Sequence, residues 1–210
     1  MLDINMKYFT TFFLILIIMI FSESKPQKDL QHSDIYPYII SKDYPSPDST
    51  SGIAYSIGHE LKATLVRETG DLVTNISKQE IDEMKLSVNQ AWLLAIENLK
   101  TKFRNGDINA AIFNGPRDKP FLLIGGHWLA ASIILLPNLY EWAQQNFNTD
   151  TLCASIPHRA ALLIFEKVDT GYLTDMIKMI KEKESNEPKQ LSFGLFELTS
   201  NGISVLDLIK

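Results

Sequence analysis

Short blocks of apolar residues along the chain predict pairs of β-strands, each pair followed by a helix. Residues 62–67 and 71–76 are β-branched, partly alternating runs on either side of Gly70, which is typical of a β-hairpin. The same arrangement recurs at residues 108–113 with 121–124, 152–156 with 161–165, and 191–197 with 203–206. Because strands joined by short turns pair antiparallel, we expect an α+β fold. Its mostly antiparallel sheet would consist of repeated strand-strand-helix units, with helices packed mainly on one face.

Capping residues and helical spacing predict the helices between these pairs. Two capping boxes, at residues 77–80 and 87–90, predict a short helix followed by a longer one. Apolar residues then recur at helical spacing along one side of the longer helix; they are Val88, Trp92, Ala95, Ile96, Leu99 and Phe103. Residues 128–147 form a further helical run that contains Pro137, which predicts a kink or two abutting helices. The last predicted helix covers residues 171–184.

The amino terminus has the pattern of an export signal. Lys7 precedes an uncharged apolar run over residues 8–21, and Ser22-Glu23-Ser24 then fits a small-x-small cleavage site. The run is shorter than the roughly 20 apolar residues that span a bilayer comfortably, which favours a cleaved signal peptide over residues 1–24. We therefore expect a periplasmic or extracellular protein. An N-terminally membrane-anchored protein is the alternative, and the membrane would then be contacted only through this segment.

The residues after the signal divide into a polar segment and one domain. Residues 25–58 are rich in Ser, Asp, Pro and Lys, which predicts a polar tether or outer wrap ahead of a single α+β domain at residues 59–210. Within the polar segment, residues 35–40 form an apolar island. Pro37 excludes a central strand there because proline has no N–H to donate, so the island should dock as an edge segment.

Composition and charge exclude several classes of protein. Hydrophobic residues make up 45% of the 210 residues, enough for one good core. A net charge of -5 provides no general basic field for a phosphate backbone, so we expect no nucleic-acid partner. One cysteine, Cys153, rules out an internal disulfide framework. The four histidines have no metal-ligand spacing, so we expect no metal site and no cofactor.

Two predicted turns contain the residue types that bind anions. In Pro157-His158-Arg159, between two strands, the guanidinium and imidazole could hold an anionic group, or the segment could be a surface turn in which Arg159 caps backbone carbonyls. In Gly125-Gly126-His127, ahead of a helix, backbone N–H groups and an imidazole could surround an anion. This segment lacks the further glycine and lysine of phosphate loops, which favours a flexible connection.

Two further residues are candidates for chemistry. Cys153 with His127 or His158 is the only conceivable thiol-nucleophile pair, because a thiolate needs a nearby base or cation at neutral pH. A cysteine among apolar strand residues is, however, usually a small core residue. Asn98 lies near the end of an amphipathic helix, where its amide could bind a ligand or, as we favour, the backbone.

Several short stretches occur in an order that resembles a known family. They are Leu86-Ser-Val-Asn-Gln-Ala91 leading into Ala95-Ile-Glu-Asn-Leu99, then Ala131-Ser-Ile-Ile-Leu-Leu136, Ser155-Ile-Pro157-His-Arg159 and Leu191-Ser192. This order resembles the YtpQ-like family of bacterial proteins of unknown function, over roughly residues 34–200. The resemblance implies a shared fold and no established activity. The family is largely cytoplasmic, unlike a chain with an export pattern, and Ala160 stands where the family usually has an acid.

These observations support two functional hypotheses. The first is an exported, non-catalytic domain that binds a protein or a component of the cell envelope, because no catalytic constellation is present. The second is a small hydrolase or transferase with its site at residues 125–127 and 157–159, which requires the two turns to lie close together. The oligomeric state is left open by the sequence.

Overall fold

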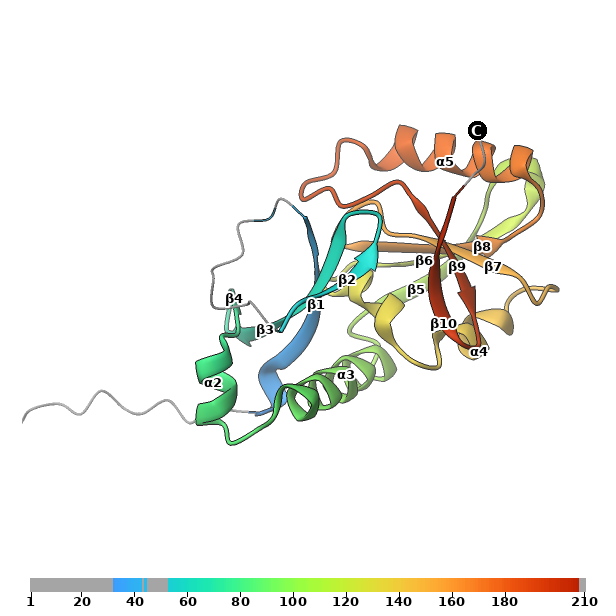
Figure 1. Ribbon diagram of the computed structural model, residues 1–210. Helices are drawn as coiled ribbons and strands as arrows, with labels where there is room; N and C mark the ends of the chain where they lie inside the picture. The colour runs from blue at the N-terminus through green and yellow to red at the C-terminus, as the bar shows by residue number, and fades with distance from the viewer. Residues whose placement is uncertain (1–31, 43, 45–52, 208–210) are drawn as a thin grey trace, which may run out of the picture. The chain divides into compact units, whose positions relative to one another are not determined.

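The computed structural model describes residues 32–42, residue 44 and residues 53–207, and these belong to one compact unit (Figure 1). The predicted signal peptide, residues 1–24, lies outside the described residues, as does the start of the predicted tether. Within the described ranges, no helix has the length and apolar character that a membrane crossing requires.

A four-stranded antiparallel sheet contains the first strands of the chain (Figure 1). Its strands are β1 (Ile35–Ser41), β2 (Tyr55–Gly58), β3 (Leu61–Thr69) and β4 (Leu72–Asn75). Strand β1 pairs with β3 along its whole length, while β2 and β4 also pair with β3. Among the described strands, β1 lies at the edge of this sheet, where a proline is tolerated, so the predicted edge position is confirmed.

The remaining strands form a six-stranded antiparallel sheet in the order β10-β9-β7-β8-β6-β5. They are β5 (Asn109–Asn114), β6 (Pro120–Gly125), β7 (Leu152–Ser155), β8 (Ala161–Glu166), β9 (Leu195–Thr199) and β10 (Gly202–Leu206). Each hairpin predicted from the sequence is present, as β3–β4, β5–β6, β7–β8 and β9–β10. The α+β fold with antiparallel pairing is therefore confirmed, and its strands divide between two sheets.

The helices lie close to the segments that the sequence predicted, but the run at residues 128–147 is only partly helical. The α-helices of the described residues are α2 (Lys78–Glu83), α3 (Val88–Arg104), α4 (Leu139–Gln144) and α5 (Thr170–Glu184). Both predicted capping boxes form, at Ser77 for α2 and at Ser87 for α3. Around Pro137 the run divides into the 3-10 helix η4 (Ala130–Leu135) and α4, so the prediction of two abutting helices is confirmed.

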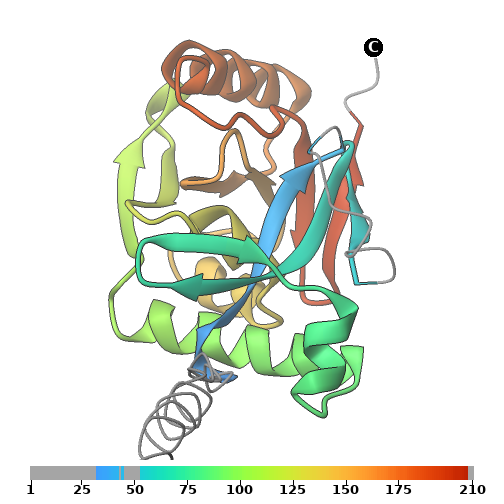
Figure 2. The same ribbon diagram turned by 90° about the vertical axis from the view of Figure 1, so that its left-hand side faces the viewer.

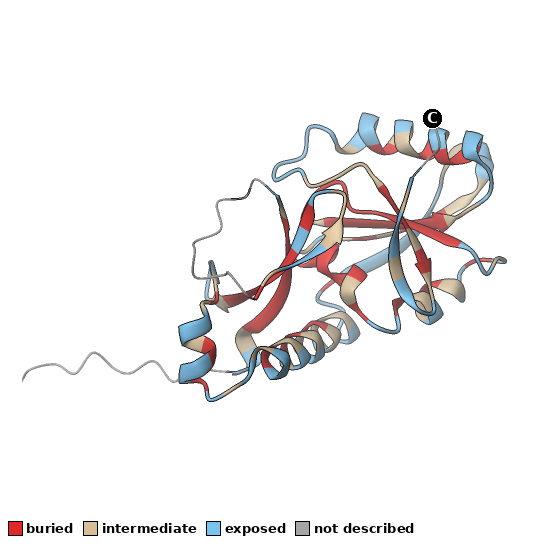
Figure 3. Ribbon diagram, in the orientation of Figure 1, coloured by how far each residue is buried: buried red, intermediate tan, exposed pale blue. Residues whose placement is uncertain are grey.

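Two apolar clusters cover the two faces of the six-stranded sheet (Figure 3). On one face, α5 packs Tyr172 and Met176 against Phe165. On the other face, strand residues such as Leu162 and Ile164 pack with the small sheet, η4 and α3. Among the described α-helices, α3 and α4 thus share one side of the large sheet with the small sheet, and α5 covers the opposite side.

The apolar side of α3 packs on β1. Trp92 is not among the residues of α3 that are most buried. Ala91, Ala95 and Leu99 have no exposed surface. Trp92 is only partly buried, and its Nε1 donates to the carbonyl of Ile53 over 3.1 Å. The smaller residues therefore face β1 most closely, while the tryptophan lies at the border of the core.

A buried arginine joins α2 to the small sheet. Arg67 on β3 is 8% exposed, and its Nη1 donates to Oε1 of Glu80 over 3.0 Å. The second carboxylate oxygen of Glu80 accepts from the N–H of Ser77 over 2.8 Å, which completes the capping box. Glu80 therefore neutralises a buried charge and caps a helix at the same time.

Candidate functional site

The two turns singled out by the sequence lie at the same end of the six-stranded sheet. Strand β6 ends at Gly125, which pairs directly with Ala161 at the start of β8. Gly126 then has a φ of +78°, in the left-handed region that favours glycine. Residues 125–127 and 157–159 are therefore neighbours, which is the arrangement that the second hypothesis requires.

His158 does not face the neighbouring turn. Its side chain is buried, its Nε2 lies 2.9 Å from Oε2 of Glu184 on α5, and its Nδ1 accepts from the N–H of Ala160. Both ring nitrogens are thus engaged, and the residue fastens the end of α5 to the β7–β8 turn. Our expectation of a surface turn is wrong for His158, because an imidazole with both nitrogens bonded can be buried at low cost.

Arg159 points to the other face of the sheet, toward β1. Its guanidinium lies over the ring of Tyr38 at 4.9 Å and over the ring of Tyr44 at 4.8 Å, measured to the ring centroids. Burial raises the pKa of the Tyr38 hydroxyl, and the positive charge of Arg159 opposes that rise. Arg159 therefore acts as a cation between two aromatic rings. The two consecutive residues of this turn thus make contacts on opposite faces of the sheet, His158 with α5 and Arg159 with β1.

His127 contributes to packing around Trp128. The two rings stack at 5.5 Å between centroids, and Nδ1 of His127 accepts from the N–H of Leu129 over 3.1 Å. Burial and then the charge of Lys102 lower the pKa of His127, so its imidazole is neutral at pH 7. The ring of Trp128 in turn meets the rings of Tyr36 and Tyr38 on β1 in edge-to-face contacts. The segment after Gly126 is thus fixed by aromatic contacts to β1.

Asn98 has a structural role. Its Nδ2 donates to the carbonyls of His32 and Ile35, over 2.8 and 3.0 Å. These bonds hold the start of β1 on α3, as favoured from the sequence. The amide donor is therefore already committed to the backbone.

Cys153 lies fully buried in the sheet, and burial raises the pKa of its thiol to about 12. A reagent cannot reach a thiol with no exposed surface, and the raised pKa keeps this thiol protonated, so the folded protein should react with a thiol reagent at pH 8 far more slowly than the unfolded chain. Labelling with 5,5′-dithiobis(2-nitrobenzoate) before and after addition of guanidinium chloride compares the two rates. Fast labelling of the folded chain would contradict the buried, protonated thiol.

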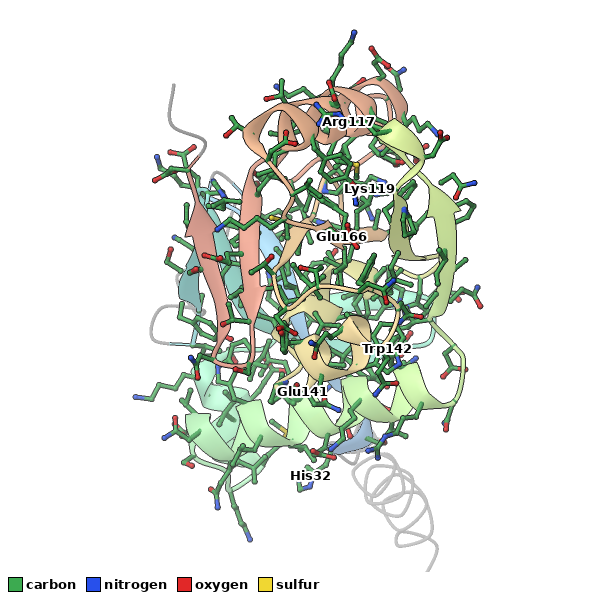
Figure 4. The ribbon with its side chains drawn as sticks, turned by 90° about the vertical axis from the view of Figure 1, so that its right-hand side faces the viewer. His32, Arg117, Lys119, Glu141, Trp142 and Glu166 are labelled. Carbon is green, nitrogen blue, oxygen red and sulfur yellow. The ribbon has the colours of Figure 1, made fainter. Side chains whose placement is uncertain are left out.

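The described residues form a cleft of about 320 Å³ that the sequence did not indicate. It lies between the end of α3, the start of β5 and α4, and Figure 4 shows Trp142 on the α4 side. Its residues are mostly apolar or cationic: Lys100, Phe103, Arg104, Ile108, Ala110, Leu136, Asn138, Leu139 and Trp142. The rings of Phe103 and Trp142 meet edge to face at 4.9 Å. We call this site the α3–α4 cleft.

The charges at the α3–α4 cleft are positive. Lys100 and Arg104 lie four residues apart, on one side of the last turns of α3, and both line the cleft. Lys100 also pairs with Glu97, whereas no ion pair to Arg104 is found among the described residues. Glu97 balances the charge of Lys100, and the end of a helix has a partial negative charge of only about half a unit, so the full positive charge of Arg104 exceeds it. The cleft therefore favours a ligand with an apolar body and an anionic group.

A second, more open cleft lacks such charges. It measures about 670 Å³ and lies around Trp92 and Leu93 of α3, Tyr55 of β2 and Leu135 of η4. Its lining has no charged residue and only Asn89 and Tyr55 as polar side chains. Few groups there could fix the orientation of a ligand, so the α3–α4 cleft is the better candidate site.

The choice of the α3–α4 cleft rests on its own geometry, without support from a metal site or from a known relative. Within the described residues, no group of three or more His, Cys, Asp or Glu side chains is arranged to hold a metal ion. In the comparisons with known proteins, no family model, no curated protein and no solved structure matches the chain.

Proposed function

We propose that this protein is a non-catalytic binding protein of the cell envelope or extracellular space, and that the α3–α4 cleft is its ligand site. The ligand class is an amphipathic anion: an apolar or aromatic body with one carboxylate, sulfonate or phosphate group. The observation that carries the proposal is the combination of an aromatic pair, aliphatic walls and two cations in one cleft.

The lining of the cleft supports binding rather than catalysis. It includes no Ser, Thr, Cys, His, Asp or Glu, and hence no hydroxyl or thiol nucleophile and no His or carboxylate that could act as its general base. Phe103 and Trp142 offer ring surfaces to an apolar body, while Arg104 supplies planar N–H donors that suit a carboxylate or phosphate. This combination of rings and a planar cation supports the binding of one amphipathic anion.

The export part of the proposal rests on residues 7–24, and the resemblance to the YtpQ-like family stays a prediction beside it. A fusion of residues 1–30 to a reporter that is active only after export provides the test. Activity of the reporter supports an exported protein, and cleavage near Ser24 distinguishes a signal peptide from an anchor. A reporter that stays in the cytoplasm would remove the export claim and leave the binding site to be judged separately.

The binding part can be tested with an aromatic sulfonate, 8-anilinonaphthalene-1-sulfonate, by its fluorescence on titration. We expect Arg104→Gln to weaken binding roughly three- to tenfold, the loss typical of one partly exposed charge pair. Removing the ring with Trp142→Leu should also weaken binding, because the probe loses an aromatic contact. Binding should become weaker as salt is added, since the charges are open to solvent.

Two controls make the test specific to the cleft. Lys178→Gln removes an exposed positive charge from α5, on the opposite face of the sheet, and should leave the affinity unchanged. The uncharged analogue N-phenyl-1-naphthylamine should bind more weakly and should not respond to Arg104→Gln. The cationic cleft is not the site if the uncharged analogue binds as tightly as the sulfonate. The same conclusion follows if Lys178→Gln and Arg104→Gln change the affinity for the sulfonate equally.

The alternative, a small hydrolase or transferase at residues 125–127 and 157–159, is favoured by one observation, the shared end of the sheet. However, His158 is bonded to Glu184, and Arg159 lies between two tyrosine rings. A hydrolase there would therefore depend on His127, whose Nδ1 already accepts from the backbone. His127→Gln abolishing a measured esterase or phosphatase activity would favour this alternative.

A further inference from the structure

One edge of the six-stranded sheet is open. The sheet ends at β10 on one side and at β5 on the other. Strand β10 is approached by β2 of the small sheet, so closely that a side-chain carbon on Gly58 would collide with Val205. All six residues of β5 are exposed, and in Figure 2 its hairpin with β6 lies at the margin of the ribbon. No strand of the described residues pairs with the outer side of β5, so its N–H and C=O groups there can pair with a further strand.

The sequence of β5 lacks the usual protection of an edge strand. Exposed edges normally carry charged residues, proline or a bulge, because these prevent pairing with another chain. Strand β5 reads Asn-Ala-Ala-Ile-Phe-Asn, has no charge or proline, and pairs with β6 in regular register. Two of its large apolar side chains are exposed, Ile112 by 53% and Phe113 by 47%. Such an edge is a site for β-strand addition.

We propose that β5 pairs with β5 of a second copy of this chain, antiparallel and around a two-fold axis at Ile112. A two-fold axis perpendicular to the sheet keeps each side chain on its own face, so only residues of equal parity can lie opposite one another. Centred on Ile112, the register places Ile112 against Ile112 of the second copy, and Phe113 against Ala111. The large ring is then beside a small side chain, and both exposed apolar residues are covered.

The charge of the protein favours this edge over other surfaces for self-association. A chain with a net charge of -5 repels its own copy at long range, so a contact between two copies is favoured where neither copy carries a charge. The uncharged strand β5 provides such a contact. Ala110 also lines the α3–α4 cleft, so in this register Asn114 of the second copy would border the cleft wall. Because a pair of short strands makes a small interface, we expect a dissociation constant of roughly 10 to 300 µM.

Analytical ultracentrifugation of the full-length chain between about 1 and 500 µM should show a monomer–dimer equilibrium. Ile112→Lys places two positive charges at the two-fold axis and should weaken the dimer at least tenfold. Leu72→Lys, which changes an exposed strand residue of the small sheet in the same way, should leave the dimer unchanged. Association that persists in Ile112→Lys, or is lost equally in Leu72→Lys, would show that another surface is responsible.

Cysteine cross-linking tests the register independently. Ile112→Cys should form an interchain disulfide under mild oxidation, since residues opposite each other in an antiparallel strand pair have Cα atoms about 4.5 to 5.5 Å apart, within the range that a disulfide bridges. The native Cys153 does not interfere because it is fully buried. Ala110→Cys should not cross-link, because its own copy lies several residues away. Efficient cross-linking of Ala110→Cys, or none of Ile112→Cys, would overturn the proposed pairing.

Discussion

Replacing Glu80 with alanine should lower the free energy of unfolding by roughly 3 to 5 kcal/mol. The change leaves the guanidinium of Arg67, 8% exposed, without its carboxylate partner. An uncompensated buried charge is among the most destabilising results of a single substitution, because the charge has been removed from bulk water and then loses its partner. The same substitution removes the acceptor for the N–H of Ser77 and so opens the capping box of α2, typically worth about 1 kcal/mol.

Denaturant unfolding of the wild type, Glu80→Ala and Glu83→Ala measures the effect, with the slope of the transition as the check on two-state behaviour. Glu83 is the matched control, since it lies on the same helix, is exposed, and bonds only to Gln79 in the described part of the chain. Its loss should cost less than about 0.5 kcal/mol. Equal effects of the two substitutions would mean that the buried pair contributes nothing beyond helix propensity.

A comparably large loss, about 3 to 5 kcal/mol, is expected for Leu162→Ala. Leu162 on β8 has no exposed surface and lies in the layer between the six-stranded sheet and the elements that cover it from the side of β1. The truncated side chain would leave a cavity that cannot close, because β8 is held by strands on both of its sides. Thermal and denaturant unfolding should both register the loss.

Leu72→Ala is the matched control for Leu162→Ala. Leu72 lies on β4, is 68% exposed, and loses little buried area when it is shortened. We expect a change within about 0.5 kcal/mol. If Leu162→Ala is as mild as this control, the two sheets do not share the packed layer that the fold requires.

The sequence was a good guide to local structure, because local structure depends on local chemistry. The hairpins followed from short turns between β-branched runs, and the boundaries of α2 and α3 followed from serine caps with Glu80 and Gln90. The pairing of strands that are distant in the sequence could not be predicted in the same way. Strand β2 has only four residues and no alternating pattern, and the division into two sheets depends on which hairpin edges meet, which no local spacing encodes.

Predicting site residues from their chemical type was less successful than predicting strands and helices from the pattern of residues. His158, Arg159 and Asn98 were singled out for their chemistry, yet each is engaged in contacts that hold the fold together. The α3–α4 cleft escaped notice because its residues come from separate elements. A partial signal was present: Lys100 and Arg104 share one side of α3 with Phe103 between them, although such spacing also describes an ordinary solvated helix face.

The order of strands in the large sheet also has a consequence for how the chain is made. All four strands of the small sheet precede α2, so they can pair while later residues are still being synthesised. Strand β7, which is fully buried, lies between β8 and β9, and β9 follows only after α5. A chain arrested after α5 would therefore carry a paired small sheet beside an apolar strand with one open edge. Such an intermediate would be prone to aggregation until β9 pairs with β7.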